Sequence, residues 1–338
     1  MRDEPLIDSM LAAIDQGMRI YIDTAMDGSP AAFKEIIQYQ LGWVGEENGK
    51  KAFGKRTRPL LLLLVCYALG GDWRKAMPAA ISVELLHNYT LIHDDIEDRS
   101  LTRRGRDCIW VKWGEAQAIN VGDAMCALAG SACCDLRKNF DDITVLSAVA
   151  LLNQTNFMLT GGQFLDMAFE LAEEANLDDY WKMVQGKTGE LISACFALGG
   201  LLSENSHCDL EKIKNLGMKI GIAFQVQDDW LGIWGNQTEI GKSIQSDLRD
   251  RKKTYPILTA LHQLPDFREY WVAHSSFTDQ DVEKLLDILD HSEVQAFTRQ
   301  QSDRLYQDVL ADLPGIFRDQ SRLQPLQDSI AGLLKRSK

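Results

Sequence analysis

Apolar residues recur at spacings of three and four along almost the whole chain, whereas stretches of strict apolar and polar alternation are few. The first spacing places apolar side chains on one face of an α-helix, and alternation is the pattern of a half-buried strand. The pattern therefore predicts an all-α protein. We expect helices at about residues 6–26, 30–43, 56–70, 75–98, 114–137, 141–169, 177–203, 209–234, 253–263, 278–290, 291–311 and 316–335.

Two of these segments, 141–165 and 184–202, are apolar on nearly every face, which predicts central helices of a large bundle. Glycine and proline are scattered and no linker stands out, so we expect one domain over residues 1–338. Polar and basic connections fall at residues 45–58, 100–114 and 235–255. If the helices that they join end on the same side of the bundle, these connections would surround one opening of its interior.

Apolar residues make up 45% of the 338 residues, enough for a sizeable core, and the net charge is -13. That charge argues against nucleic acid or an anionic membrane surface as a partner. The apolar run 60–65 is too short to cross a bilayer, so no stable membrane insertion is expected. The N-terminal residues show no basic and apolar secretory pattern, and seven irregularly spaced cysteines suggest buried thiols. We therefore expect a soluble cytoplasmic protein.

Two groups of acids follow long apolar stretches: Asp94, Asp95 and Asp98 in one, and Asp228 and Asp229 in the other. Residues i and i+4 share a face of a helix, so Asp94 and Asp98 present their carboxylates together. Clustered carboxylates repel one another unless a cation lies between them. Mg²⁺ suits such sites because it takes a few carboxylates and completes its shell with water and substrate phosphates. The alternative, a solvated acidic helix end, is less favoured because the arrangement occurs twice.

Basic residues accompany each acidic group. Lys55, Arg56 and Arg58 precede an apolar helix, whose N-terminus favours an anion. Arg103, Arg104 and Arg106 follow the first acidic group, and Lys242 with residues 251–253 follows the second. A metal-storage bundle has no use for these cations, whereas a polyphosphate ligand does. Other readings remain open at this point: a solvated turn at 54–59, a surface-reaching Lys187, and core roles for His87 and Gln225.

The chain resembles the trans-isoprenyl diphosphate synthases. The motifs that carry this resemblance lie in family order between about residues 50 and 256: Gly-Lys-Arg-Thr-Arg-Pro at 54–59, Glu84-Leu-Leu-His87, Asp94-Asp-Ile-Glu-Asp98, Arg103-Arg104-Gly105, Gly122-Asp123, Lys187-Thr188, Phe224-Gln225-Val-Gln-Asp228-Asp229, Gly241-Lys242 and Lys252-Lys253-Thr254. The resemblance implies the all-α isoprenoid synthase fold with a central active-site cavity, and a homodimer. It also implies a prenyltransferase that condenses isopentenyl diphosphate with dimethylallyl, geranyl or farnesyl diphosphate.

The resemblance also implies roles for individual residues. Mg²⁺, about three ions per active site with substrate bound, would be held by Asp94, Asp95, Asp98, Asp228 and Asp229. The allylic diphosphate would be met by Arg103, Lys187, Gln225 and Lys242, and the isopentenyl diphosphate by Lys55, Arg58, His87 and Arg104. Lys252 is a further expected substrate contact. Lys187 and Thr188 would stabilise the cationic reacting state, and the departing diphosphate would accept the proton.

One position departs from the family pattern, in which many members carry Asp-Asp-x-x-Asp as the second motif. Gly232 stands where the last aspartate is expected, so we predict a weaker third metal without loss of catalysis.

Product length would be set by a side chain that blocks the growing chain beneath Asp94. Tyr89 lies about 7.5 Å before Asp94 along the helix, and Thr90 lies between them. A tyrosine at this position resembles members that stop near C20, although a plain core aromatic is the alternative. Geranylgeranyl diphosphate is the first expectation, and farnesyl or longer products are the alternatives. A terpene cyclase or a non-catalytic bundle is less favoured, because the second cationic set and all three first-motif aspartates are present.

Overall fold

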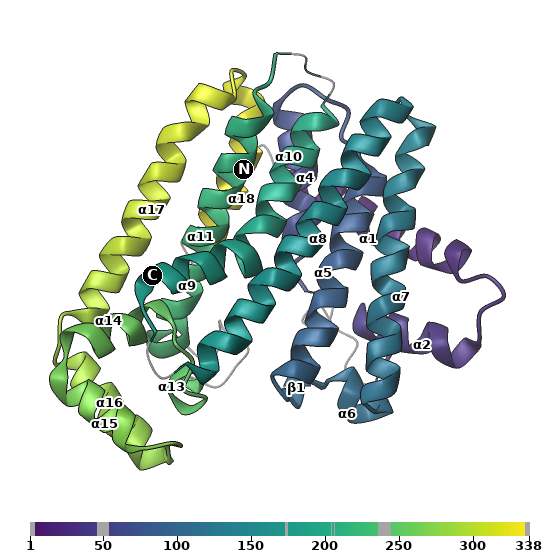
Figure 1. Ribbon diagram of the computed structural model, residues 1–338. Helices are drawn as coiled ribbons and strands as arrows, with labels where there is room; N and C mark the ends of the chain where they lie inside the picture. Colours follow the sequence, from purple (N-terminus) through teal and green to yellow (C-terminus); the bar gives the residue numbers. More distant parts are fainter. Residues whose placement is uncertain are drawn as a thin grey trace. The chain divides into compact units, whose positions relative to one another are not determined.

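The computed structural model describes residues 4–45, 54–172, 175–203, 205, 207–235 and 245–334, and these are almost entirely helical (Figure 1). The elements are α1 (Glu4–Ala25), α2 (Ala31–Gln40), α4 (Thr57–Ala68), α5 (Met77–Glu97), β1 (Thr102–Arg103), β2 (Arg106–Asp107), α6 (Ile109–Trp113), α7 (Glu115–Cys134), η1 (Asp135–Lys138), α8 (Asp142–Leu171), α9 (Leu177–Val184), η2 (Gln185–Gly189), α10 (Glu190–Leu201), α11 (Leu210–Trp234), α13 (Ser246–Arg249), α14 (Tyr255–Gln263), α15 (Pro265–Ala273), α16 (Asp279–Asp290), α17 (Val294–Ile316) and α18 (Gln320–Leu334). The predicted all-α fold is confirmed.

The segment 100–114, expected as an irregular connection, instead contains a tight hairpin and the short helix α6. Strands β1 and β2 pair antiparallel, and the two residues between them, Arg104 and Gly105, have φ angles of 56° and 77°. Two consecutive positive φ angles are typical of the two-residue turns that join twisted strands. An arginine at the first turn position hid this hairpin from the sequence, because asparagine or aspartate is the usual signal there.

Contacts divide the chain into two compact units. Unit 1 contains residues 1–156, 194–214 and 316–329, and unit 2 contains 157–193, 215–315 and 330–338. Helices α8, α10 and α11 each have residues in both units. The expectation of one domain stays a prediction, and each unit is described by itself below.

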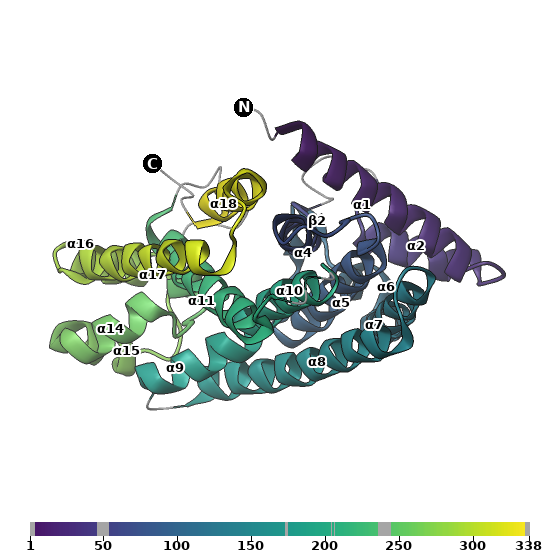
Figure 2. The same ribbon diagram turned by 90° about the horizontal axis from the view of Figure 1, so that it is seen from above.

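The core of unit 1 is built around α4 and α5. Residues 60–66 of α4 are all buried, and α5 is buried on every side from Ala79 to Leu86 and again at Asn88 and Ile92. Helix α7 lies along α5, as both views show (Figures 1 and 2). A nearly continuous apolar run on α4 therefore marks a helix that is buried on almost every side, and α5 carries the first aspartates out of this core.

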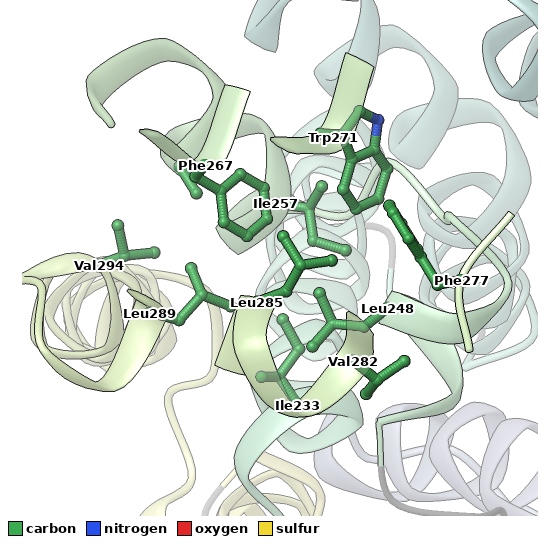
Figure 3. Close-up of a cluster of buried hydrophobic side chains, with 11 residues drawn as sticks. Ile233, Leu248, Ile257, Phe267, Trp271, Phe277, Val282, Leu285, Leu289 and Val294 are labelled. Carbon is green, nitrogen blue, oxygen red and sulfur yellow. The ribbon is translucent and has the colours of Figure 1, made fainter. Parts of the chain in front are cut away.

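Unit 2 has a cluster of buried apolar side chains contributed by the end of α11 and by α13 to α17 (Figure 3). Ile233 of α11 and Leu248 of α13 lie in it beside Ile257, Leu285 and Leu289. A second cluster joins Phe169, Tyr180, Val184, Val226, Tyr255 and Leu258. These two clusters fix the end of α11, where the second pair of aspartates lies.

The prediction that residues 141–165 form a buried central helix is wrong for the single chain. Residues Asp142–Glu170 are long and apolar enough to cross a membrane, with a mean hydropathy of 1.3, but only 22% of the apolar window is buried. One such helix is weak evidence for membrane insertion, because helices covered by other protein surfaces have the same composition. The other apolar segment is buried as predicted, with Leu191, Ile192 and residues 194–198 among the least exposed of the chain.

Candidate active site

The first aspartates lie at the C-terminal end of α5. Asp98 caps the helix, and its backbone N–H donates to the Asp94 carbonyl oxygen at 2.9 Å. Asp94 and Asp98 therefore share one face, as the spacing predicts. A helix C-terminus carries partial negative charge, so carboxylates there need a compensating cation. In the structure Asp95 is 3% exposed, and burial, the largest cause, raises the pKa of its carboxyl group.

Arg103 supplies positive charge to this helix end. From the hairpin, its Nε donates to Asp95 Oδ1 at 2.7 Å and its Nη2 donates to Asp94 Oδ2 at 3.1 Å. Burial lowers the pKa of Arg103, but the charges of Asp95 and Asp94 outweigh it and raise the pKa above its usual value. The hairpin therefore places a guanidinium against the first aspartates, as expected for a group that neutralises charge there.

A second cationic set lies in the same unit. Arg58 Nη1 lies 3.0 Å from His87 Nε2. Burial and the neighbouring Arg58 hold the pKa of His87 well below 6.5, so the ring is neutral and its Nε2 accepts from the guanidinium. A Cβ atom added to Gly54 would lie 2.7 Å from the guanidinium carbon of Arg104. After burial, the charges of Arg58 and Arg104 are the next causes that lower the pKa of His87, so these three side chains lie near one another, and Lys55 is exposed beside Gly54.

A buried ion pair holds this cationic loop. Arg56, only 4% exposed, donates to Glu84 Oε1 at 2.7 Å and to Asp15 Oδ1 at 3.0 Å. Asn88 Nδ2 donates to the same Glu84 oxygen at 3.1 Å. Arg56 faces inward with a φ of 48°, between Lys55 and Arg58 in the sequence. No role for Glu84 was predicted from the sequence, although an acid within an apolar helix, three residues before His87, was a usable signal.

Lys187 and Thr188 lie in η2, a single π-helical turn between α9 and α10. Such turns are rare and often mark functional sites. The backbone of this turn packs closely against glycines of two neighbouring helices. A Cβ atom at Gly186 would lie 2.7 Å from the Gly162 Cα of α8, and one at Gly221 of α11 would lie 2.6 Å from the Gly189 Cα. Backbones approach this closely only where no side chain intervenes.

Polar contacts tie the same turn to both neighbouring helices. Lys187 Nζ donates to Asp166 Oδ2 of α8 at 2.5 Å. Thr188 Oγ1 donates to Gln225 Oε1 of α11 at 2.7 Å. Asp166 was missed from the sequence, although it is one of few acids in the largely apolar helix α8. Gln225 is hydrogen-bonded to Thr188 and to Asp229, and its expected contact with the allylic diphosphate stays a prediction.

Asp229 is buried and its two carboxylate oxygens are occupied. Gln225 Nε2 donates to Oδ1 at 2.8 Å, while the Tyr180 hydroxyl and the Tyr255 N–H donate to Oδ2 at 2.6 and 3.0 Å. Burial raises the pKa of Asp229 to about 7, against these hydrogen bonds, which lower it. Its expected metal contact stays a prediction. The observed geometry fits a residue that positions Gln225, whereas its neighbour Asp228 is half-buried.

The basic residues that follow the second acidic group make different contacts. Arg251 Nη1 donates to the Trp271 carbonyl oxygen at 3.0 Å. Lys253 Nζ donates to the carbonyl oxygens of Phe169, Glu170 and Ala172 at 2.6, 2.9 and 2.6 Å, which caps the C-terminus of α8. Lys252 is half-buried between them. Lys242 lies outside the described residues.

The expected floor residues lie one to two turns before Asp94. Tyr89 packs edge-on against His93 with ring centroids 5.0 Å apart, and Thr90 Oγ1 donates to the His87 carbonyl oxygen at 2.8 Å. A Cβ atom at Gly122 of α7 would lie 2.2 Å from His93 Nε2, so this glycine makes room for the histidine ring. Tyr89 and His93 together form an aromatic pair just before the first aspartates of α5.

The acids of each unit fit Mg²⁺ by their chemistry, because they offer hard carboxylate oxygens at the end of a helix. Within the described ranges, no group of three or more His, Cys, Asp or Glu side chains is assembled into a complete metal site. An incomplete set of protein ligands is the usual arrangement for Mg²⁺ that is shared with substrate phosphates. The expected contacts of Asp94, Asp98 and Asp228 with Mg²⁺ stay predictions.

Comparison with known proteins agrees with the motifs. The family model described as polyprenyl synthetase matches residues 46–289. A (2E,6E)-farnesyl diphosphate synthase of Mycobacterium tuberculosis is 40% identical over 227 residues, which are 66% of this chain and 62% of that protein. A geranylgeranyl diphosphate synthase of the same species is 34% identical over 286 residues, 83% of this chain and 81% of that protein.

The fold has close relatives among solved structures. A geranylgeranyl pyrophosphate synthetase from Pyrococcus horikoshii superimposes with a TM-score of 0.84 and 25% identity, covering 98% of this chain and 99% of that one. The resemblance drawn from the motifs is therefore confirmed. The family match spans most of the chain, and the chain belongs to the polyprenyl synthetase family.

Proposed function

We propose that the protein is a trans-prenyltransferase that condenses isopentenyl diphosphate with an allylic diphosphate. The observation that carries this proposal is the second cationic set of unit 1. Arg58 and Arg104 lie near His87, whereas Arg103 donates to the carboxylates of Asp94 and Asp95. One diphosphate needs only one anion site, so a separate set of cations supports a second diphosphate substrate.

In this reaction the chain's own residues divide into two groups. Lys55, Arg58 and Arg104 would bind the isopentenyl diphosphate through charge-assisted hydrogen bonds, with neutral His87 orienting Arg58. Asp94, Asp95, Asp98 and Asp228 would hold Mg²⁺, and bound Mg²⁺ would supply positive charge to the departing allylic diphosphate. Arg103, Lys187 and Gln225 would orient that diphosphate.

The bond changes balance within the two substrates. The allylic C–O bond breaks and its electron pair leaves with the diphosphate, while the alkene of isopentenyl diphosphate forms the new C–C bond. A proton then leaves the adjacent carbon, and the released diphosphate accepts it. The Thr188 hydroxyl, held to Gln225, and Lys187, held to Asp166, line this chemistry and stabilise its charges.

A class I terpene cyclase is the competing activity, because it shares the metal-binding acids and the ionisation step. It binds one diphosphate and would leave Arg58 and Arg104 without a ligand. Incubation with an allylic diphosphate and labelled isopentenyl diphosphate separates the two activities. The proposal requires Mg²⁺-dependent incorporation of label into a longer diphosphate, and cyclic hydrocarbon without incorporation would replace it with the cyclase.

We propose geranylgeranyl diphosphate as the main product, with farnesyl diphosphate or a longer chain as alternatives. Tyr89 supports this, since it lies about 7.5 Å before Asp94 along α5 and packs against His93. The relatives named above include both C15 and C20 synthases. Product chromatography with dimethylallyl, geranyl and farnesyl diphosphate as starters distinguishes these lengths.

We further propose a homodimer that covers the exposed apolar side chains of α8. Ile143, Leu146, Phe157 and Phe164 are 78%, 68%, 72% and 71% exposed in the single chain. Light scattering during gel filtration is expected to give twice the chain mass, and Leu146→Glu is expected to reduce it. A cytoplasmic location is part of the same proposal and is supported by the cysteines, all of which are free thiols.

A further inference from the structure

Gly232 of α11 lies four residues after Asp228, on the same face of the helix and about 5.4–6 Å along it. The structure shows what occupies the space of a side chain there. A Cβ atom built at Gly232 would lie 2.2 Å from Asp247 Oδ2 and 2.9 Å from Asp247 Cγ. The Asp247 carboxylate therefore lies where the side chain of a residue at 232 would begin.

The position of Asp247 is fixed by its neighbours. The next residue, Leu248, is fully buried and packs in the apolar cluster with Ile233, which follows Gly232 on α11 (Figure 3). The Gln245 N–H donates to the Gly232 carbonyl oxygen at 3.2 Å, and the Lys252 N–H donates to the Asp247 carbonyl oxygen at 2.9 Å. The apolar contact of Leu248 and the hydrogen bond from Gln245 thus hold α13 against the end of α11.

We propose that Asp247 replaces the missing third aspartate of the second motif and provides a carboxylate to the cation held by Asp228. This inference rests on the proposed function. Asp247 comes from α13, and its carboxylate occupies the space of a side chain at Gly232, one helical turn beyond Asp228. In this arrangement Gly232 is required, because any larger side chain displaces the Asp247 carboxylate. The weaker third metal predicted from Gly232 alone is then offset by a residue fifteen positions later.

Restoring the family's aspartate at position 232 should not improve cation binding. Gly232→Asp places a second carboxylate on the one already there, so it should weaken cation binding rather than strengthen it. Asp247→Asn should also weaken it, because a neutral amide replaces a charged ligand. The exchange of both residues, Gly232→Asp with Asp247→Gly, returns a single carboxylate to the site and should recover binding.

The test measures Mn²⁺ binding in the presence of inorganic diphosphate, followed by electron paramagnetic resonance, so that no turnover is needed. Each single variant should weaken the affected ion by about tenfold, the size of effect seen when groups supporting a metal are removed. The double variant should bind within about threefold of the original protein. Asp250→Asn, an exposed acid in the same segment, is the matched control and should leave binding unchanged.

Circular dichroism and thermal melting establish that each variant is folded, and Asp247→Asn alone carries the test if Gly232→Asp does not fold. Normal Mn²⁺ binding by Asp247→Asn overturns the inference, as does a double variant no better than either single one. Product formation by the unchanged protein is measured separately. Failure of product formation with the expected binding pattern would overturn the proposed function and leave the role of Asp247 in cation binding.

Discussion

Replacement of Glu84 tests whether the buried ion pair organises the cationic loop. Both side chains of the Arg56–Glu84 pair are 3% exposed, and the two groups lie 2.7 Å apart. Removing one member of a buried pair costs about 3–5 kcal/mol, because the remaining charge stays desolvated. Asp15, at 3.0 Å and 39% exposed, retains part of the compensation for Arg56. We therefore expect Glu84→Ala to destabilise unit 1 by about 3 kcal/mol, the lower end of that range.

Hydrogen exchange read by mass spectrometry resolves this loss in peptides of α4 and α5, and urea unfolding gives the overall change. The existence of two compact units makes a single unfolding transition an unsafe measure on its own. Glu84→Gln keeps an oxygen acceptor for Arg56 and Asn88 and should lose less. Glu283→Ala removes an exposed acid of α16 and should change little.

The same variant has a kinetic signature. Because Arg56 holds the segment that carries Lys55 and Arg58, Glu84→Ala should raise KM for isopentenyl diphosphate about tenfold, equivalent to about 1.4 kcal/mol, with a smaller effect on the allylic substrate. A loss below about 1 kcal/mol together with unchanged KM values would refute the reasoning, since loss of the buried partner of a guanidinium costs at least that much.

Three further predictions follow from the same contacts. Gly186→Ala forces a methyl group to within 2.7 Å of the Gly162 Cα and should cost about 1–3 kcal/mol and lower kcat, measured by thermal melting and steady-state rates. The lowered pKa of His87 means that the unfolded chain binds more protons below pH 6.5, so stability of the substrate-free protein should rise with pH through that window, and His87→Asn should flatten this part of the urea profile. Tyr89→Ala removes one ring of the Tyr89–His93 pair and should give a longer product, which chromatography measures. An unchanged product length would mean that other residues limit chain growth.

Helical periodicity was sufficient to predict the fold class and most helices, because amphipathic faces and capping signals act locally. It did not predict α15, whose start at Pro265 follows only one residue after α14 ends. It also gave the wrong environment for α8, since an apolar helix has the same composition whether its own chain or another surface covers it. The local sequence pattern shows how apolar a segment is, whereas tertiary packing determines whether that segment is buried.

The acids and cations of the site were predicted as residue types, but their contacts were not. The spacing placed Asp94 and Asp98 on one face, and the order of charges placed Arg103 near them. The three donors to Asp229 come from α9, α11 and the start of α14. The contact of Asp247 with Gly232 likewise joins residues brought together by a buried apolar cluster, which no local sequence signal reveals.

The most direct test of the central claim is the ratio of diphosphate released to isopentenyl diphosphate consumed, measured with an allylic starter and Mg²⁺. The condensation requires one diphosphate for each isopentenyl diphosphate consumed. It also predicts that Arg58→Ala and Arg104→Ala reduce both quantities together. Release of diphosphate from the allylic substrate at full rate without isopentenyl diphosphate consumption would contradict the account and indicate a cyclase or a hydrolase.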